Sequence, residues 1–177
     1  DNENRVIRNV DSNLIDDYNL SLDISYNSSM FSWWYLTIYT STFYMEQEFY
    51  SVESVPLTYT NSTFGFYAQL YSGLTLSSKK AITSDITMLY ISDYITGGYD
   101  HDSQFNLSIS FRKEFWDNRA SLSVGVDDIL DTNNYPLSTQ YYNQDNGYLA
   151  QYESRLFRVG FKYNFGNARL QDTNRDS

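Results

Sequence analysis

The chain has 177 residues and a net charge of −10, from 22 Asp and Glu against 12 Lys and Arg. This acidic balance argues against nucleic-acid binding, which needs a basic surface. The lack of cysteine excludes a disulfide framework and thiolate metal sites. With 18 Tyr, 11 Phe and only 2 Pro the composition suits pleated strands, and no stretch approaches the roughly 20 apolar residues of a membrane helix.

Seven segments alternate apolar and polar side chains with a period of two, which predicts strands that each have one apolar face. In chain order they are 17–27, 32–45, 62–77, 82–95, 103–115, 119–130 and 152–165. In the last segment Phe157, Val159 and Phe161 share one face, and Arg158 and Lys162 share the other. A soluble β-sandwich would bury such an apolar face, whereas a membrane barrel would turn it toward lipid and keep the cations in a wet lumen.

The connections between these segments alternate between short and long. The turns at 27–30, 77–80 and 116–119 are short, while 46–62 and 131–150 are long. Trp33, Trp34, Phe115 and Trp116 flank two of the short turns. Membrane barrels have short periplasmic turns, long external loops and aromatic girdles. The pattern therefore predicts an all-β, antiparallel up-and-down transmembrane β-barrel whose strands pair with their sequence neighbours.

Seven strands are an odd number, whereas single-chain bacterial barrels have an even number and both termini in the periplasm. We therefore expect residues 1–165 to be the C-terminal part of a larger barrel and 166–177 to be a periplasmic tail. On this hypothesis the strands at 17–27 and 152–165 each keep one free edge. The alternative is an eighth strand within 5–10 that closes a small barrel.

The end of the chain resembles the C-terminal β-signal of outer-membrane proteins. The matching residues are Arg158, Gly160, Tyr163 and Phe165, which supply a polar position, a spaced glycine and two alternating aromatic positions. The resemblance implies that the barrel-assembly machinery reads these residues.

Two segments resemble the last strands of TonB-dependent-receptor-like outer-membrane barrels. They are 105–116, which is similar to the antepenultimate strand, and 122–132, which is similar to the penultimate one. The resemblance implies the outer membrane of a Gram-negative bacterium, about 22 strands around an N-terminal plug, and nutrient uptake. It also implies outer-membrane lipid and TonB as partners, TonB through a region outside these residues, and in some members a surface lipoprotein.

Five charged residues are expected to face the lumen: Asp85, Arg112, Asp127, Arg158 and Lys162. The cations among them are expected to pair with Asp85 or Asp127, and lumenal charges of this kind tune selectivity or solvate the wall. Asp128 and Asp131 lack the glycine and the distal Glu of an EF-hand loop, so they are expected to end a strand at the external rim.

No sequence motif of catalysis is present, so we expect neither an enzyme nor a cofactor. The single histidine, His101, lies between Asp100 and Asp102. A solvated turn is favoured there over a metal site, because one imidazole with adjacent carboxylates cannot surround an ion.

Two other functions remain open. One is an accessory or structural barrel of a secretion or surface complex, which a plug and a TonB box would argue against. The other is a soluble β-sandwich or adhesin domain, which would need no detergent for extraction.

Overall fold

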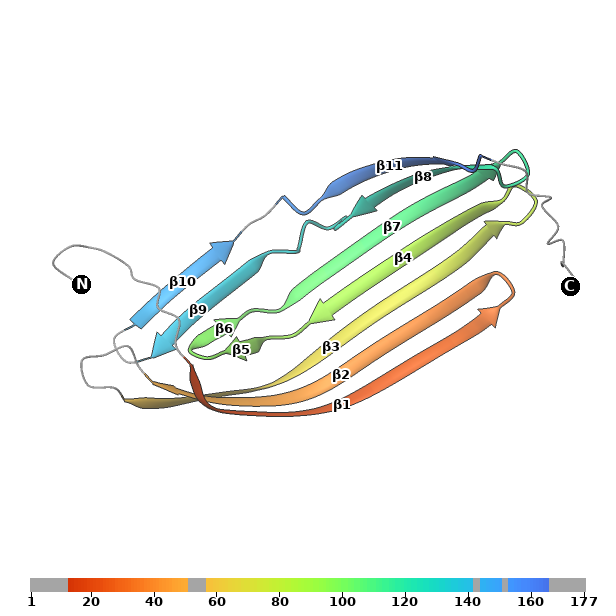
Figure 1. Ribbon diagram of the computed structural model, residues 1–177. Helices are drawn as coiled ribbons and strands as arrows, with labels where there is room; N and C mark the ends of the chain where they lie inside the picture. The colour runs from red at the N-terminus through yellow and green to blue at the C-terminus, as the bar shows by residue number, and fades with distance from the viewer. Residues whose placement is uncertain (1–12, 51–56, 142–143, 151–152, 166–177) are drawn as a thin grey trace, which may run out of the picture.

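The computed structural model describes residues 13–50, 57–141, 144–150 and 153–165, and within them the chain forms two antiparallel sheets (Figure 1). The larger sheet has seven strands. In spatial order they are β1 (Leu14–Phe31), β2 (Trp34–Tyr50), β3 (Thr58–Ser77), β4 (Ile82–Ile91), β7 (Gln104–Phe115), β8 (Ala120–Asp127) and β11 (Leu156–Tyr163). Each pairs antiparallel with its neighbour, so the predicted up-and-down order is confirmed.

The smaller sheet has four strands. They are β10 (Gln144–Ala150), β9 (Tyr135–Tyr141), β6 (Tyr99–His101) and β5 (Tyr94–Thr96). This sheet lies at the end of the molecule opposite the turns that join β1 to β2, β3 to β4 and β7 to β8 (Figure 1). The predicted asymmetry between short turns and long connections is therefore present, and the last strand runs toward the short-turn end.

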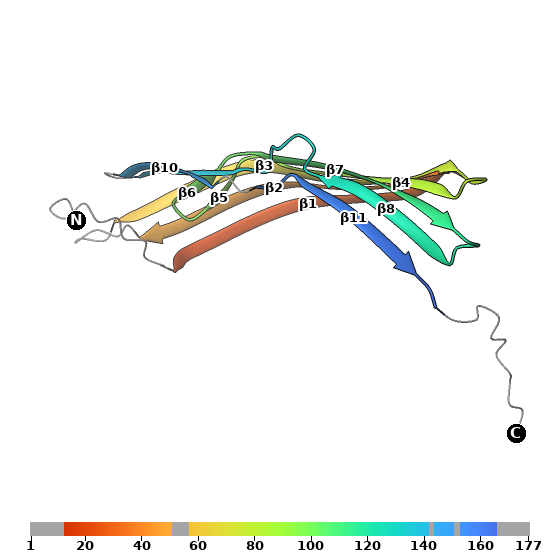
Figure 2. The ribbon, with the colours of Figure 1, turned by 90° about the horizontal axis from the view of Figure 1, so that it is seen from above.

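The large sheet is an open arc rather than a closed ring (Figure 2). Within the described residues β1 pairs only with β2, and β11 pairs only with β8. The two free edges that the sequence predicts are thus found. The alternative eighth strand within 5–10, and the tail 166–177, both lie outside the described residues.

Predicted boundaries were wrong in the first hairpin and in the connection after it. β1 continues through the expected turn at 27–30 as far as Phe31, and the turn is formed by Ser32 and Trp33. Stacked rings hold the hairpin in this register, with centroids of Phe31 and Trp33 5.5 Å apart. The expected loop 46–62 is mostly strand, because β2 extends to Tyr50 and β3 begins at Thr58.

The strand expected at 82–95 ends at Ile91, because Ser92 closes the β3–β4 ladder. Its N–H donates to the carbonyl of Phe66 over 2.8 Å, and its hydroxyl accepts from the N–H of Phe66 over 2.8 Å. The chain then leaves the sheet as the β5–β6 hairpin. It returns at Ser103, whose N–H donates to Asp93 over 2.7 Å. The expected loop 131–150 likewise contains the β9–β10 hairpin.

The last two predicted strands are shorter than expected. The strand at 119–130 ends at Asp127, because Asp128 adopts a positive φ of 45° and starts a turn. The strand at 152–165 is regular only over Leu156–Tyr163.

The large sheet has no packed core. Within the described residues the buried apolar side chains are Phe49, Ile95 and Ala120, while Phe64 is 73% exposed and Phe161 is 65% exposed. A β-sandwich would interdigitate Phe64 and Phe161 between two sheets. The soluble β-sandwich alternative is therefore wrong, and the apolar face needs a cover from outside this chain segment.

Candidate functional site

The register places most apolar side chains of the seven long strands on one face of the large sheet. One row of directly opposed residues crosses β1, β2, β3, β4 and β7: Tyr26, Ile38, Leu70, Met88 and Leu107. A second row continues from β7 to β11: Phe111, Val124 and Val159. Because the parity persists across every pairing, the polar side chains share the other face.

Aromatic side chains gather at the short-turn end of the sheet. Trp33 and Trp34 stack at 6.1 Å between centroids in the first turn. Trp116, in the turn before β8, contacts the ring of Tyr163 edge-on at 6.1 Å. Lys113 lies on the apolar face, opposite Leu122. These rings and this cation form the kind of belt that marks a membrane–water boundary.

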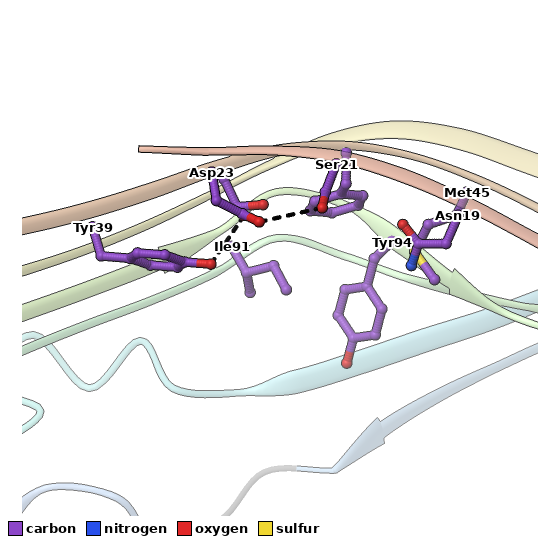
Figure 3. Close-up of a pocket in the computed structure, with 9 residues that line it drawn as sticks. Asn19, Ser21, Asp23, Tyr39, Met45, Ile91 and Tyr94 are labelled. Carbon is purple, nitrogen blue, oxygen red and sulfur yellow. Dashed lines mark hydrogen bonds between the residues drawn. The ribbon is translucent and has the colours of Figure 1, made fainter. Parts of the chain in front are cut away.

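Tyrosine–carboxylate pairs line the polar face of the sheet, and Figure 3 shows one of them, Tyr39 with Asp23. Tyr39 donates to Asp23 over 3.0 Å, and Tyr71 donates to Asp85 over 2.6 Å. The rings are braced in turn, with Tyr67 packed edge-on against Tyr39 at 5.8 Å. Hydrogen bonds from phenols to carboxylates fix the positions of both groups on this wall.

The structure places the five predicted charged residues on the polar face. The pairs that show this parity are Asp85 opposite Ser110, Arg112 opposite Ser123, Arg158 opposite Gly125, and Lys162 opposite Ser121. Arg158 forms an ion pair with Asp127, one of the two partners that the sequence offered. Asp85 instead accepts from Tyr71, a partner that the sequence pattern did not indicate.

A shallow pocket of about 350 Å³ opens on this polar face (Figure 3). It is lined from β1 by Asn19, Ser21 and Asp23, from β2 by Tyr39, Ser41, Phe43 and Met45, and from the following segments by Ile91 and Tyr94. The ring of Phe43 lies over Gly65, where an added Cβ would come within 2.2 Å of the ring. Gly65 is thus needed for Phe43 to lie flat against the pocket wall.

The β5–β6 hairpin folds over the polar face beside this pocket. Gln47 of β2 accepts from the N–H of Gly97 over 2.6 Å, and Asn61 of β3 donates to Asp100 over 2.9 Å. Ile95, which belongs to β5 of this hairpin, is only 3% exposed. The hairpin thereby brings Tyr94 to the pocket, although sequence reasoning had assigned this segment to the end of a strand and a turn.

Asp128 anchors the loop that follows β8. Its side chain has no exposed surface and accepts from the backbone N–H groups of Thr132, over 3.2 Å, and Asn133, over 3.0 Å, and from the hydroxyl of Ser154. Burial by itself raises the pKa of Asp128, but these hydrogen bonds outweigh it and hold the pKa below its usual range. The carboxylate is therefore a structural part of the rim, as its position at the end of a strand suggested.

His101 is part of the hairpin. Its ring stacks on Tyr94 at 4.3 Å and 3°. Burial lowers the pKa of His101, although Asp100 opposes this effect. No group of three or more metal-ligating side chains occurs in the described part of the chain. His101 thus acts as a packing residue here.

Comparison with known proteins identifies the class to which this curved, two-faced sheet belongs. The sequence profile of the outer membrane protein beta-barrel family matches residues 1–163. The chain belongs to that family. Searches of curated proteins and of solved structures gave no match.

Membership assigns this outer membrane β-barrel protein to the bacterial outer membrane. Across residues 13–50, 57–141, 144–150 and 153–165 there is no helix long and apolar enough to span a bilayer. In a barrel the apolar face of the sheet meets lipid and the polar face lines the lumen. We therefore expect the pocket, the tyrosine–carboxylate pairs and the hairpin to lie on the lumenal side.

Of the predicted assembly-signal residues, Tyr163 and Phe165 lie at the short-turn end of β11, whereas Arg158 lies near the start of the strand. Gly160 has the same parity as Arg158, and an added Cβ there would approach the Ser123 hydroxyl to 2.7 Å. Tyr163 and Phe165 contact each other edge-on at 4.6 Å, and Phe165 is 90% exposed. Their recognition by the assembly machinery stays a prediction.

Proposed function

We propose that this protein is a TonB-dependent-receptor-like barrel that takes up a nutrient across the outer membrane, and that the seven long strands are the last of about 22. The role is binding and passage without covalent chemistry. TonB and a plug would act through a region outside the described residues, and a surface lipoprotein could cover the external mouth.

The open edges of the large sheet support the proposal most directly. A strand edge in hydrocarbon leaves unsatisfied N–H and C=O groups, each of which costs roughly several kcal/mol. β1 and β11 each have such an edge within the described residues. We therefore infer that further strands lie between them in the membrane.

The lumenal wall also supports a role in handling a ligand. It carries a pocket lined by aromatic and carboxylate side chains, and a hairpin held over the wall by Gln47 and Asn61. A hollow of this kind on the wall could hold part of a ligand during passage. This feature favours transport over the accessory-barrel alternative.

Uptake by intact cells tests the proposal. Cells with the protein, cells without it and cells without TonB would be grown in one medium, and the depletion of medium components would be followed by mass spectrometry. We expect one component to be depleted only when both the protein and TonB are present. Unchanged depletion in all three strains would favour the accessory role instead.

Electron cryo-microscopy of the full-length protein tests the size of the barrel independently. We expect β11 to pair on its free edge with a strand outside residues 13–165. A barrel of eight strands, closed by residues 5–10 between β11 and β1, would refute the large-barrel proposal.

A further inference from the structure

The lumenal pocket differs from the rest of the wall in its charge. Between residues 9 and 111 the sequence contains 11 Asp and Glu, whereas its only basic residues are Lys79 and Lys80. Both lysines lie in the turn between β3 and β4, at the short-turn end of the sheet. The basic lumenal residues Arg112, Arg158 and Lys162 all lie on β7 and β11, across the sheet from β1 and β2.

The pocket holds one carboxylate, that of Asp23, for which no ion pair is found within the described residues. Asp23 accepts from the hydroxyls of Tyr39, over 3.0 Å, and Ser21, over 3.4 Å. Both ion pairs found among the described residues involve other carboxylates, those of Asp127 and Asp131. The two hydroxyl donors orient the Asp23 carboxylate without removing its charge, so it remains able to attract a positive group.

Two tyrosine rings line the same pocket, Tyr39 beside this carboxylate and Tyr94 farther along, toward Asn19 and Met45 (Figure 3). Tyr39 is held by its hydrogen bond to Asp23 and by the ring of Tyr67. Tyr94 is held by stacking on His101, a ring whose lowered pKa favours its uncharged form. Figure 3 shows Tyr39, Asp23 and Tyr94 on the same side of the strands. Aromatic faces beside a carboxylate attract ammonium and guanidinium groups through the ring quadrupole and through charge.

We propose that the pocket formed by Asp23, Tyr39 and Tyr94 binds the cationic group of an organic ligand, such as an alkylammonium. Asp23 supplies the counter-charge, and the ring of Tyr39 supplies the face against which the cation packs. Tyr94 and Asn19 line the other end of the pocket, where they offer a ring and an amide to the remainder of the ligand. This inference rests on the proposed uptake function and names the chemical class of the ligand.

The test compares choline with its uncharged carbon isostere, 3,3-dimethylbutan-1-ol, as probes for the full-length protein in lipid nanodiscs. Binding is measured by ligand-observed NMR titration. Because the two probes match in shape, their difference in affinity reports the charge. We expect choline to bind at least roughly tenfold more tightly than the isostere.

Three variants locate the effect. Asp23→Asn keeps the shape of the side chain and should abolish the preference for choline, whereas Glu114→Gln, a matched loss of charge at the short-turn end of the lumenal face, should leave it unchanged. Tyr39→Leu should weaken choline binding by roughly tenfold through loss of one ring. Correct folding of each variant is checked by its heat-dependent shift in gel mobility.

Several outcomes would overturn the inference: equal binding of both probes, no saturable binding of choline, or an undiminished preference in Asp23→Asn. The titration uses neither TonB nor an energy source. A failed titration with intact TonB-dependent uptake would therefore remove only the assignment of ligand class. Selective choline binding without any uptake would remove the transport function instead.

Discussion

Replacement of one lipid-facing side chain by arginine should reveal the orientation of the large sheet. Ile109 lies on the apolar face of β7, opposite Ile86 on one side and Val126 on the other. It is five residues from Gln104 and six from Phe115, the two ends of the strand. At about 3.3 Å per residue and a tilt of about 40°, these separations correspond to depths of about 13 and 15 Å. Ile109 should therefore lie close to the midplane of the bilayer.

Arginine on the lipid face at this depth costs about 2–4 kcal/mol. The adjacent residue provides a matched control, because Ser110 points to the lumenal face and is directly opposite Asp85. An arginine there stays in the wet lumen beside a carboxylate, so Ser110→Arg should change the free energy of unfolding by less than about 1 kcal/mol. The two variants should differ by at least about 1 kcal/mol, which is roughly fivefold in the unfolding equilibrium.

The assay is reversible unfolding of the full-length protein from phospholipid vesicles by guanidinium chloride, followed by tryptophan fluorescence. Ile109→Arg should lower the midpoint, while Ser110→Arg should leave it near that of the unmodified protein. If Ser110→Arg were equally or more destabilising, the assignment of the two faces to lipid and lumen would be wrong.

Three further predictions concern the hairpin and the rim. Gln47→Ala removes the acceptor for the N–H of Gly97 and should loosen the β5–β6 hairpin. A cysteine placed at Ile95 should then react with a thiol reagent roughly tenfold faster than in the protein that keeps Gln47. An unchanged rate would show that other contacts hold the hairpin. The pKa of His101 measured by NMR should lie below that of a free histidine. At pH values between the folded and the unfolded pKa of His101, the unfolded hairpin binds more protons than the folded one. The stability of the hairpin should therefore fall as the pH drops from the unfolded pKa to the folded pKa. Asp128→Ala leaves buried donors unpaired and should destabilise the protein by about 2–4 kcal/mol in denaturant titrations. Asp127→Ala breaks only a partly exposed ion pair and should cost no more than about 1 kcal/mol. Equal effects of the two variants would contradict the anchoring role of Asp128.

The sequence alone determined the parity and order of the seven long strands. Side chains in a strand point alternately to opposite faces, so the run from Phe157 to Phe161 could only place Arg158 on the face away from the aromatic rings. Short turns force antiparallel neighbours within the β1–β2, β3–β4 and β7–β8 hairpins, and the alternation of short and long connections predicted the rest of the order. The two faces of the sheet follow from local pattern, and the two free edges were predicted from the odd number of strands.

The tertiary structure decided what the chain does where that pattern ends. Tyr94 continues the alternation of β4, but the two hydrogen bonds between Ser92 and Phe66 stop the ladder and release the hairpin toward Gln47. The pairing of Tyr39 with Asp23 and of Tyr71 with Asp85 likewise joins different strands, and it depends on a register that no single segment contains. Contacts between residues distant in sequence follow from register and side-chain packing across strands, so the pocket could be recognised only once the strands had been aligned.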